Sequence, residues 1–446
     1  MALTSLVFFL GYLGGLALCV IRGPIWGLYT YVAVFYLHPP SRWWGMYLPG
    51  IRWSLLAAAV TLVCVLARRQ GSSRPPFTQS GIVVAFIAYV VWMWIQTPFV
   101  ISGEHVTGTV LFTKYVLLIY LIYVLIDSPE RLRDFLLAHV VGCFYLGWLV
   151  YTAPEGGGRL EGVGGPGIDD ANTMSMHFGT GVVVAAVLLL TEKKWRFWLT
   201  LAAIPFMLNG MVQGGSRGAF LGLVAGGLTL FWLKPPAYRK QFYAFAALGL
   251  LLFGYLANDV FLERLSTLGA VTSEEKELDQ SAYSRIVVIK AQWEMFFDYP
   301  LGAGHAGTTV LSPQYIPAEY LTRSSPNSTP VRASHNTFMS VVVDQGIVGI
   351  VILVALLTAV CRTVGDVTKR SGQSQEFWAY GSAIAAALMV AAVAGQFAPY
   401  LKAEVQIWML ALLVSAKSMV AHRIEHARES SSARPRVLAS QSALEP

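Results

Sequence analysis

An arginine next to the start of an apolar segment is the first feature of the sequence that could do chemistry. The sequence QGGSRGAFLG begins at residue 213 and places Arg217 directly before a hydrophobic run. A helix that begins here would offer unpaired backbone N–H groups and the positive end of its dipole. A guanidinium group beside them would complete a site for an anion such as a phosphate. The alternative is an arginine that extends to the membrane surface without a chemical role.

A histidine and an aspartate lie in a second polar patch. The sequence SHNTF begins at residue 334 and DQG begins at residue 344, so Asp344 follows His335 by nine residues. A neutral imidazole can accept a proton near pH 7, which would make His335 a general base. The alternative is that Ser334 or Asn336 caps a helix and that His335 has no chemical role.

The position of Asp344 indicates where the following membrane span begins. If the span started at Asn336, Asp344 would lie about 12 Å inside the membrane, which is costly for a carboxylate. We therefore expect a short interfacial helix over 336–344 and a span that begins near Gly346. His335 and Asp344 would then both lie near the outer membrane surface.

A second arginine, Arg285, lies in the first turns of an amphipathic segment. The apolar residues of this segment recur at helical spacing and are Ile286, Ile289, Trp293, Phe296 and Phe297. This spacing predicts a helix over 281–297 that rests on the membrane or on the mouth of a helix bundle. The sequence DYPLGAG, which begins at residue 298, is turn chemistry that ends the helix.

The elements that must position these residues are membrane-spanning helices. The chain has 446 residues, of which 55% are hydrophobic and 13% charged, about half the charge of a typical globular protein. This composition excludes a soluble protein. A spanning helix needs about 20 residues, and the apolar stretches lie near 2–21, 24–37, 51–67, 80–100, 108–126, 135–152, 173–191, 197–213, 218–233, 242–258, 346–361, 379–396 and 403–420. We predict an all-α polytopic membrane protein with 12 or 13 transmembrane helices, because the short stretch 24–37 could be half a crossing.

The basic residues indicate which side of the membrane each connection faces. The net charge is +7, but these residues are spread through short connections, so a nucleic-acid partner is not expected. Alternate connections carry most of them, for example Arg68, Arg69, Lys193 and Lys194. The positive-inside rule places these connections in the cytoplasm together with the C-terminus. The long connection 259–334 then lies on the periplasmic side.

This sidedness divides the chain into four parts. Residues 1–258 would form an N-terminal bundle of about ten spans, and 259–334 the periplasmic loop with its amphipathic helix. Residues 335–420 would form the short interfacial helix and the C-terminal spans, and 421–446 a disordered cytoplasmic tail.

The cysteines give no sign of a disulfide or a metal site. Cys19, Cys64, Cys143 and Cys361 lie singly in or at the ends of apolar stretches, without CxxC or Cys/His spacing. We therefore expect neither, and no cofactor.

The three polar patches, in this order and around a long external loop, resemble the O-antigen ligase and polymerase superfamily of bacterial inner-membrane proteins. The resemblance covers roughly 170–420 and is most specific over 213–350. The N-terminal sequences RGPIWG at 22–27 and HPPSRWWG at 38–45 are similar to a subgroup of O-glycosylation ligases associated with exosortase systems.

This resemblance implies a glycosyltransferase of the bacterial inner membrane whose active site faces the periplasm. Such a ligase moves a glycan from undecaprenyl pyrophosphate to a hydroxyl of a lipid, protein or glycan acceptor, without a metal or nucleotide. The family's motif arginines fall on Arg217 and Arg285 and its histidine on His335. The arginines would bind the pyrophosphate and keep the histidine neutral, and the histidine would take the acceptor proton with inversion at the sugar.

Further residues on the same side are candidates for substrate binding. They are Asp344 after the histidine motif, Arg159, Asp170 and Asn172 in the loop 153–172, and Lys402 and Glu404 in the last external loop. Asn172 could equally be a helix cap. His305, within GAGHAG, is expected to be a loop residue rather than a second base.

Two other functions stay open. A polysaccharide polymerase of the same superfamily would carry the same motifs. A transporter or lipid flippase would use ionisable residues inside the membrane, for which Lys114, His139 and His177 are candidates, although the sequence shows no repeated halves. A non-catalytic scaffold for envelope assembly is the weaker alternative. The sugar, the acceptor and the oligomeric state cannot be read from the sequence.

Overall fold

The computed structural model describes residues 3–68, 74–153, 162–165, 167–256, 280–323, 325, 328–370 and 374–441. In these residues the chain is almost entirely helical, and its only β pairing is an isolated bridge between Thr322 and Val331. The predicted all-α polytopic membrane class is confirmed.

A bundle of helices contains each of the predicted apolar stretches. Its members are α1 (Leu3–Ile21), α2 (Ile25–Leu37), α3 (Trp53–Ala67), α4 (Gly81–Gln96), α5 (His105–Leu125), α6 (Pro129–Thr152), α7 (Ala171–Thr191), α8 (Lys194–Gly214), α9 (Arg217–Leu233), α10 (Arg239–Leu256), α14 (Thr337–Arg370), α15 (Gln375–Ala394) and α16 (Glu404–Gln441).

By length and composition, eight of the described helices could cross a membrane, or nine if the bent pair of α9 and α10 is one span. This pair bends by 113°, and α3 and α4 are shorter apolar helices. The 13 residues of α2 reach about 20 Å, which is less than the hydrocarbon thickness. The predicted stretches are therefore all present as helices, but several are too short or too bent for a simple crossing.

The most buried spans are α7, α15 and α16, while α1 lies at the edge of the bundle. The contact between α9 and α15 is close because two glycines, Gly222 and Gly226, face α15. A Cβ at Gly222 would lie 2.6 Å from the Val390 carbonyl oxygen, and one at Gly226 would lie 2.6 Å from the Val390 side chain. Small residues spaced by four allow such backbone approach in membranes. This contact fixes the helix that begins at Arg217.

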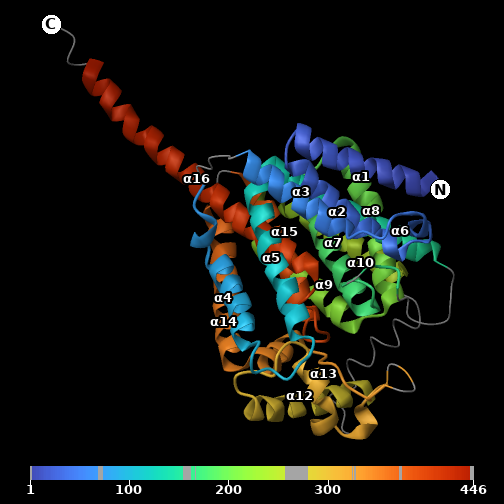
Figure 1. Ribbon diagram of the computed structural model, residues 1–446. Helices are drawn as coiled ribbons and strands as arrows, with labels where there is room; N and C mark the ends of the chain where they lie inside the picture. Colours follow the sequence, from blue (N-terminus) through green and yellow to red (C-terminus); the bar gives the residue numbers. More distant parts are fainter. Residues whose placement is uncertain are drawn as a thin grey trace.

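Two helices cover one end of the bundle. Figure 1 shows α12 (Gln280–Asp298) and α13 (Gly307–Tyr315) at the end opposite the C-terminal end of α16. One face of α12 packs Val288 and Met295 into a small apolar cluster, whereas Trp293 and Phe297 on another face are exposed. We call α12, α13 and their connections the cap.

The helix α14 breaks at Gly346, where the sequence predicts that the membrane span begins. Gly346 has φ 62° and ψ −156°, outside the helical region, and a side chain there would collide with the Pro300 carbonyl. The amide of Ile347 donates to that carbonyl at 2.9 Å. The break leaves a short segment from Thr337 to Gln345 next to the cap and a long one that continues through the bundle.

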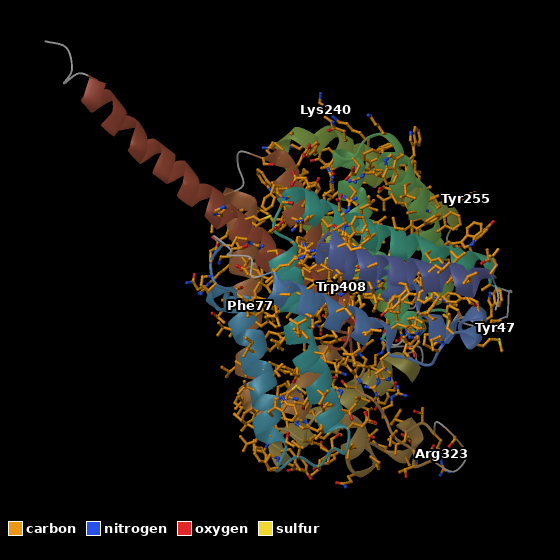
Figure 2. The ribbon with its side chains drawn as sticks, turned by 45° about the horizontal axis from the view of Figure 1, so that its top comes forward. Tyr47, Phe77, Lys240, Tyr255, Arg323 and Trp408 are labelled. Carbon is orange, nitrogen blue, oxygen red and sulfur yellow. The ribbon has the colours of Figure 1, made fainter. Side chains whose placement is uncertain are left out.

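The opposite ends of the bundle carry the connections that the charge pattern assigns to opposite sides. In Figure 2, Lys240 lies at one end of the molecule and Arg323 in the cap at the other. The C-terminal segment differs from the expectation of a disordered tail from residue 421, because α16 continues as a helix to Gln441. This segment contains alanines and arginines, which are good helix formers, but also Ser430, Ser431, Ser432 and Pro435, which are not.

Candidate functional site

The turn between α8 and α9 positions Arg217. Gly215 ends α8 in the left-handed region, with φ 57°. Ser216 then caps α9, because its hydroxyl accepts the amide hydrogen of Ala219. Arg217 is the first residue of the new helix and is half-buried. The N-terminal end of α9 and a guanidinium group therefore occur at the same place, as the motif predicts.

Phe397, in the loop between α15 and α16, joins the first two arginine motifs. Gly218, directly after Arg217, packs against it so closely that a Cβ would lie 2.6 Å from Phe397 Cβ. The Arg285 guanidinium lies over the same ring, 5.6 Å from its centroid. The start of α9 and the first part of α12 therefore meet at one aromatic side chain, although 68 positions separate the two arginines in the sequence.

The start of α14 is fastened to the same loop. The Asn336 side chain caps α14 by accepting the amide hydrogens of Phe338 and Met339, at 2.9 and 3.1 Å. Its amide nitrogen donates to Gln396 Oε1 at 3.0 Å, and Tyr400 N donates to the Thr337 hydroxyl at 2.7 Å. Asn336 thus takes the capping role that the sequence left open between two residues. The imidazole of His335 is not needed for the cap.

His335 is half-buried beside two guanidinium groups. Burial, and then the positive charges of Arg332 and Arg285, lower its pKa to about 4. Loss of solvent and nearby cations both disfavour the charged imidazolium. At neutral pH His335 is therefore uncharged and can accept a proton.

Arg332 is a residue of this site that the motifs did not indicate. Its backbone N–H donates to the Ser312 hydroxyl at 2.8 Å, and its Nη2 lies 3.3 Å from the hydroxyl of Ser284, the residue before Arg285. Its Nε is buried and has no hydrogen-bond partner among the described residues. The spacing Arg-x-x-His was visible in the sequence. It lies in an irregular segment, however, where spacing does not define a shared face.

An apolar groove lies in the bundle beside the start of α14. It has a volume of about 450 Å³ and lies between α9, α14, α15 and α16. Its lining includes Thr337 and Phe338, two and three positions after His335, and Trp232 near the end of α9. Its lining is mostly hydrocarbon, which suits a lipid chain.

A comparison with known families decides the relationship. The family model described as O-antigen ligase matches residues 202–354, from within α8 to within α14. This match supports the O-antigen ligase superfamily for these residues. The predicted resemblance is thereby confirmed, and the matched ligase domain includes Arg217, Arg285 and His335. No curated protein matches the chain significantly. The match does not reach 22–45, so the exosortase-associated subgroup stays a prediction.

Asp344 of the ligase domain lies in a separate cluster. Its carboxylate accepts the amide hydrogens of Ala306 and Gly307, at 3.1 and 2.9 Å, and its Oδ2 is 3.8 Å from His305 Nδ1. Asp344 is only 7% exposed. Asp344 is therefore buried against the loop before α13, which it holds, and its expected role in substrate binding stays a prediction.

His305 is fixed from several sides, as expected of a loop residue. Its backbone N–H donates to His105 Nδ1 at 3.0 Å, and its carbonyl accepts the hydroxyl hydrogen of Ser102. Its ring packs against Gly108, where a Cβ would lie 2.5 Å away. Burial, Lys402 and His105 lower its pKa to about 4.

The two candidates from the last external loop, Lys402 and Glu404, contact residues outside the arginine site. The positive charge of Lys402 acts on His305 and Asp344, and its carbonyl accepts the Tyr115 hydroxyl at 2.7 Å. Glu404 Oε1 accepts from the Tyr31 hydroxyl at 2.6 Å and from Trp408 Nε1 at 3.0 Å. Glu404 also lines a second cavity, of about 390 Å³, together with Lys114. This loop contributes Phe397 to the arginine site instead.

In the loop 153–172, the residue that caps α7 differs from the candidate that the sequence suggested. Asp170, not Asn172, caps α7, because its Oδ1 accepts the amide hydrogens of Asn172 and Thr173 at 3.0 Å. An aspartate at this position also interacts favourably with the helix dipole. Arg159 lies outside the described residues.

Proposed function

We propose that this protein transfers a glycan from an undecaprenyl-pyrophosphate carrier to an acceptor hydroxyl. The match of residues 202–354 to the O-antigen ligase model supports an enzyme of that type. The observation that carries the finer proposal is the position of a neutral His335 beside Arg285 and Arg332, two residues before an apolar groove's lining residue Thr337. Transfer from a lipid-linked diphosphate needs three features, namely cations for the diphosphate, a base for the acceptor hydroxyl and a path for the lipid tail.

Arg285, Arg217 and Arg332 would bind the pyrophosphate. Guanidinium groups bind phosphate oxygens bidentately, and negative charge on the pyrophosphate grows as the glycosidic bond breaks. The N-terminal end of α9 adds its dipole. The tail of the carrier would lie in the groove that Thr337 and Phe338 help to line.

His335 would act as the general base. It takes the proton of the acceptor hydroxyl while the oxygen attacks the sugar carbon and the pyrophosphate leaves with the bonding electrons. Such a proton transfer typically contributes 10² to 10⁴ in rate. Attack opposite the pyrophosphate inverts the sugar carbon, and no covalent intermediate or metal is needed.

Donor binding would tune this base. A base works best when its pKa lies near the working pH, and the pKa of His335 in the free protein is about 4. The negative charge of a bound pyrophosphate would offset Arg285 and Arg332 and raise the pKa of His335. The donor would thus strengthen the base that acts on the acceptor.

We place the protein in the bacterial inner membrane with the cap in the periplasm and the C-terminus in the cytoplasm. The support is the positive-inside pattern, together with the position of the cap at the opposite end of the bundle from the C-terminus. Partners would be the donor, membrane lipid, and a lipid, protein or glycan acceptor.

The test is transfer by the purified protein in lipid nanodiscs. A lipid-linked glycan and candidate acceptors are incubated with wild type and His335→Gln, with and without EDTA, and the products are separated by mass. We expect transfer that resists EDTA and is lost in His335→Gln, while His422→Gln near the other end of the bundle stays active. Full transfer by His335→Gln would remove the base assignment.

Product length separates the two enzyme alternatives. A ligase gives one addition per acceptor, whereas a polymerase gives a ladder of repeat units. Transport of the donor without covalent transfer would support the flippase alternative.

A further inference from the structure

Two histidines and a cysteine form a buried cluster in the middle of the bundle, away from the ligase site. His139 and Cys143 lie one turn apart on α6, and His177 faces them from α7. Their ligand atoms all lie within 4.8 Å of one another, and all three side chains are completely buried. Trp408, which Figure 2 shows in the interior of the bundle, packs against His139, with the centroids of the two rings 6.3 Å apart.

The hydrogen bonds of the cluster leave one nitrogen unused. The Tyr36 hydroxyl lies 2.6 Å from His139 Nδ1 and 2.9 Å from His177 Nε2, and His139 Nε2 lies 3.1 Å from the Thr180 hydroxyl. His177 Nδ1 is buried and has no hydrogen-bond partner among the described residues. A buried polar atom without a partner costs about 1–3 kcal/mol. The Tyr36 hydroxyl can donate to one ring and accept from the other, but it leaves His177 Nδ1 without a partner among the described residues.

A second sulfur atom lies beside the cysteine. A Cβ at Gly181 would be 2.7 Å from Met207 Sδ and 2.8 Å from Cys143 Sγ, so the two sulfurs flank the same point. The missing side chain at Gly181 makes this approach possible. The cluster therefore offers two imidazoles and a thiol, with a thioether beside the thiol.

We propose that this cluster binds one Cu(I) ion. Thiolate and thioether ligands favour Cu(I), and imidazole also suits copper. Charge supports the same choice, because Cu(I) and one thiolate are neutral together, whereas a divalent ion would leave a net charge in the membrane interior at high desolvation cost. Binding releases the thiol proton of Cys143, and the Tyr36 hydroxyl stays as a second-shell partner of a ring nitrogen.

The ion would be structural. It would tie α6 to α7, whose first turn meets the α8–α9 turn, because a Cβ at Gly214 would lie 3.1 Å from the Ala171 carbonyl oxygen. The cysteine spacing had led us to expect no metal. His139 and Cys143 lie four positions apart in the sequence, a spacing that this expectation overlooked, whereas His177 and Met207 lie on other helices and are distant in the sequence.

The test is the metal content of the intact protein. Because the ligands are buried, the ion must bind before the bundle closes, so the cells are grown with added copper and the protein is purified in detergent with a thiol-free reductant. We expect about one copper atom per chain by plasma mass spectrometry. The X-ray absorption edge should lie at the energy of Cu(I), and the fine structure should show nitrogen and sulfur ligands. If the purified wild-type protein contains no copper, or contains zinc instead, the proposal is overturned.

Variants locate the ion. Cys143→Ser and His177→Gln should each lose most of the copper, whereas Cys19→Ser, at another buried cysteine, should retain it. Copper retained by both cluster variants would contradict the assignment. The wild-type measurement stands even if these variants fail to fold.

Discussion

Two histidines next to the short first segment of α14 illustrate how similar electrostatics can accompany different roles. His335 precedes this segment and His305 lies against its end at Asp344. Burial is the largest cause of the lowered pKa in both, and each pKa is about 4. The neighbours differ, because His335 lies beside two arginines and His305 beside a carboxylate.

The difference shows that a lowered pKa does not identify a base. The backbone N–H of His305 already donates to His105 Nδ1, and the His305 ring packs against Gly108. His335 is only half-buried. Beside it lie Arg332, whose Nε has no hydrogen-bond partner in the part of the chain that the structure describes, and Thr337, which lines a groove. Unsatisfied polar groups next to an open path indicate where a substrate binds.

The largest expected effect separates the two histidines. His335→Ala should lower the rate of glycan transfer by about 10² to 10⁴, because the base is lost. His305→Ala should keep kcat within a few-fold but lower the unfolding temperature, because it opens a cavity in the cap contact. The measurements are transfer kinetics and thermal unfolding of both variants. Equal losses of kcat in both variants would erase the distinction.

Arg285 tests the cationic half of the His335 site. Arg285→Ala should lower kcat by about 10² to 10³, the usual cost of one donor to developing charge. Arg285→Lys should recover only part of this loss, because an ammonium group keeps the charge but not the bidentate geometry. Lys290→Ala, an exposed cation on the same helix, is the control. Full activity of Arg285→Ala would remove this residue from the site.

Asp344 tests the cluster around His305, which the comparison treats as structural. Asp344→Asn places an amide nitrogen against one of two backbone N–H donors, so it should cost about 2 kcal/mol in the free energy of unfolding. Transfer per folded molecule should change only a few-fold. Asp298→Asn, an exposed cap aspartate bonded to Tyr315, should cost less. A selective rise in donor KM without lost stability would instead support the substrate-binding role first expected for Asp344.

The part of the site that the sequence predicted is the part that local patterns encode. Arg217 follows from a glycine-rich helix start, Arg285 from an amphipathic period, and the break at Gly346 from the cost of a carboxylate at depth. These arguments need only neighbours along the chain.

The missed part depends on contacts between distant segments. Phe397 joins α9 to α12 from a loop that the sequence marked only for Lys402 and Glu404. Arg332 belongs to the site because the irregular segment before α14 folds back onto α12 at Ser284. No periodicity in either segment carries this information.

Arg332 provides the smallest and most specific expected effect. Its charge contributes, after burial, to the lowered pKa of His335, so Arg332→Gln should raise that pKa from about 4 toward its ordinary value. The base must be neutral, so the acid limb of kcat/KM, which reports the free protein, should move to higher pH. At neutral pH the loss of rate should be modest, since Arg285 and Arg217 still bind the donor. Arg323→Gln, elsewhere in the cap, should leave the limb in place. A limb that does not move in Arg332→Gln would mean that this guanidinium does not act on His335.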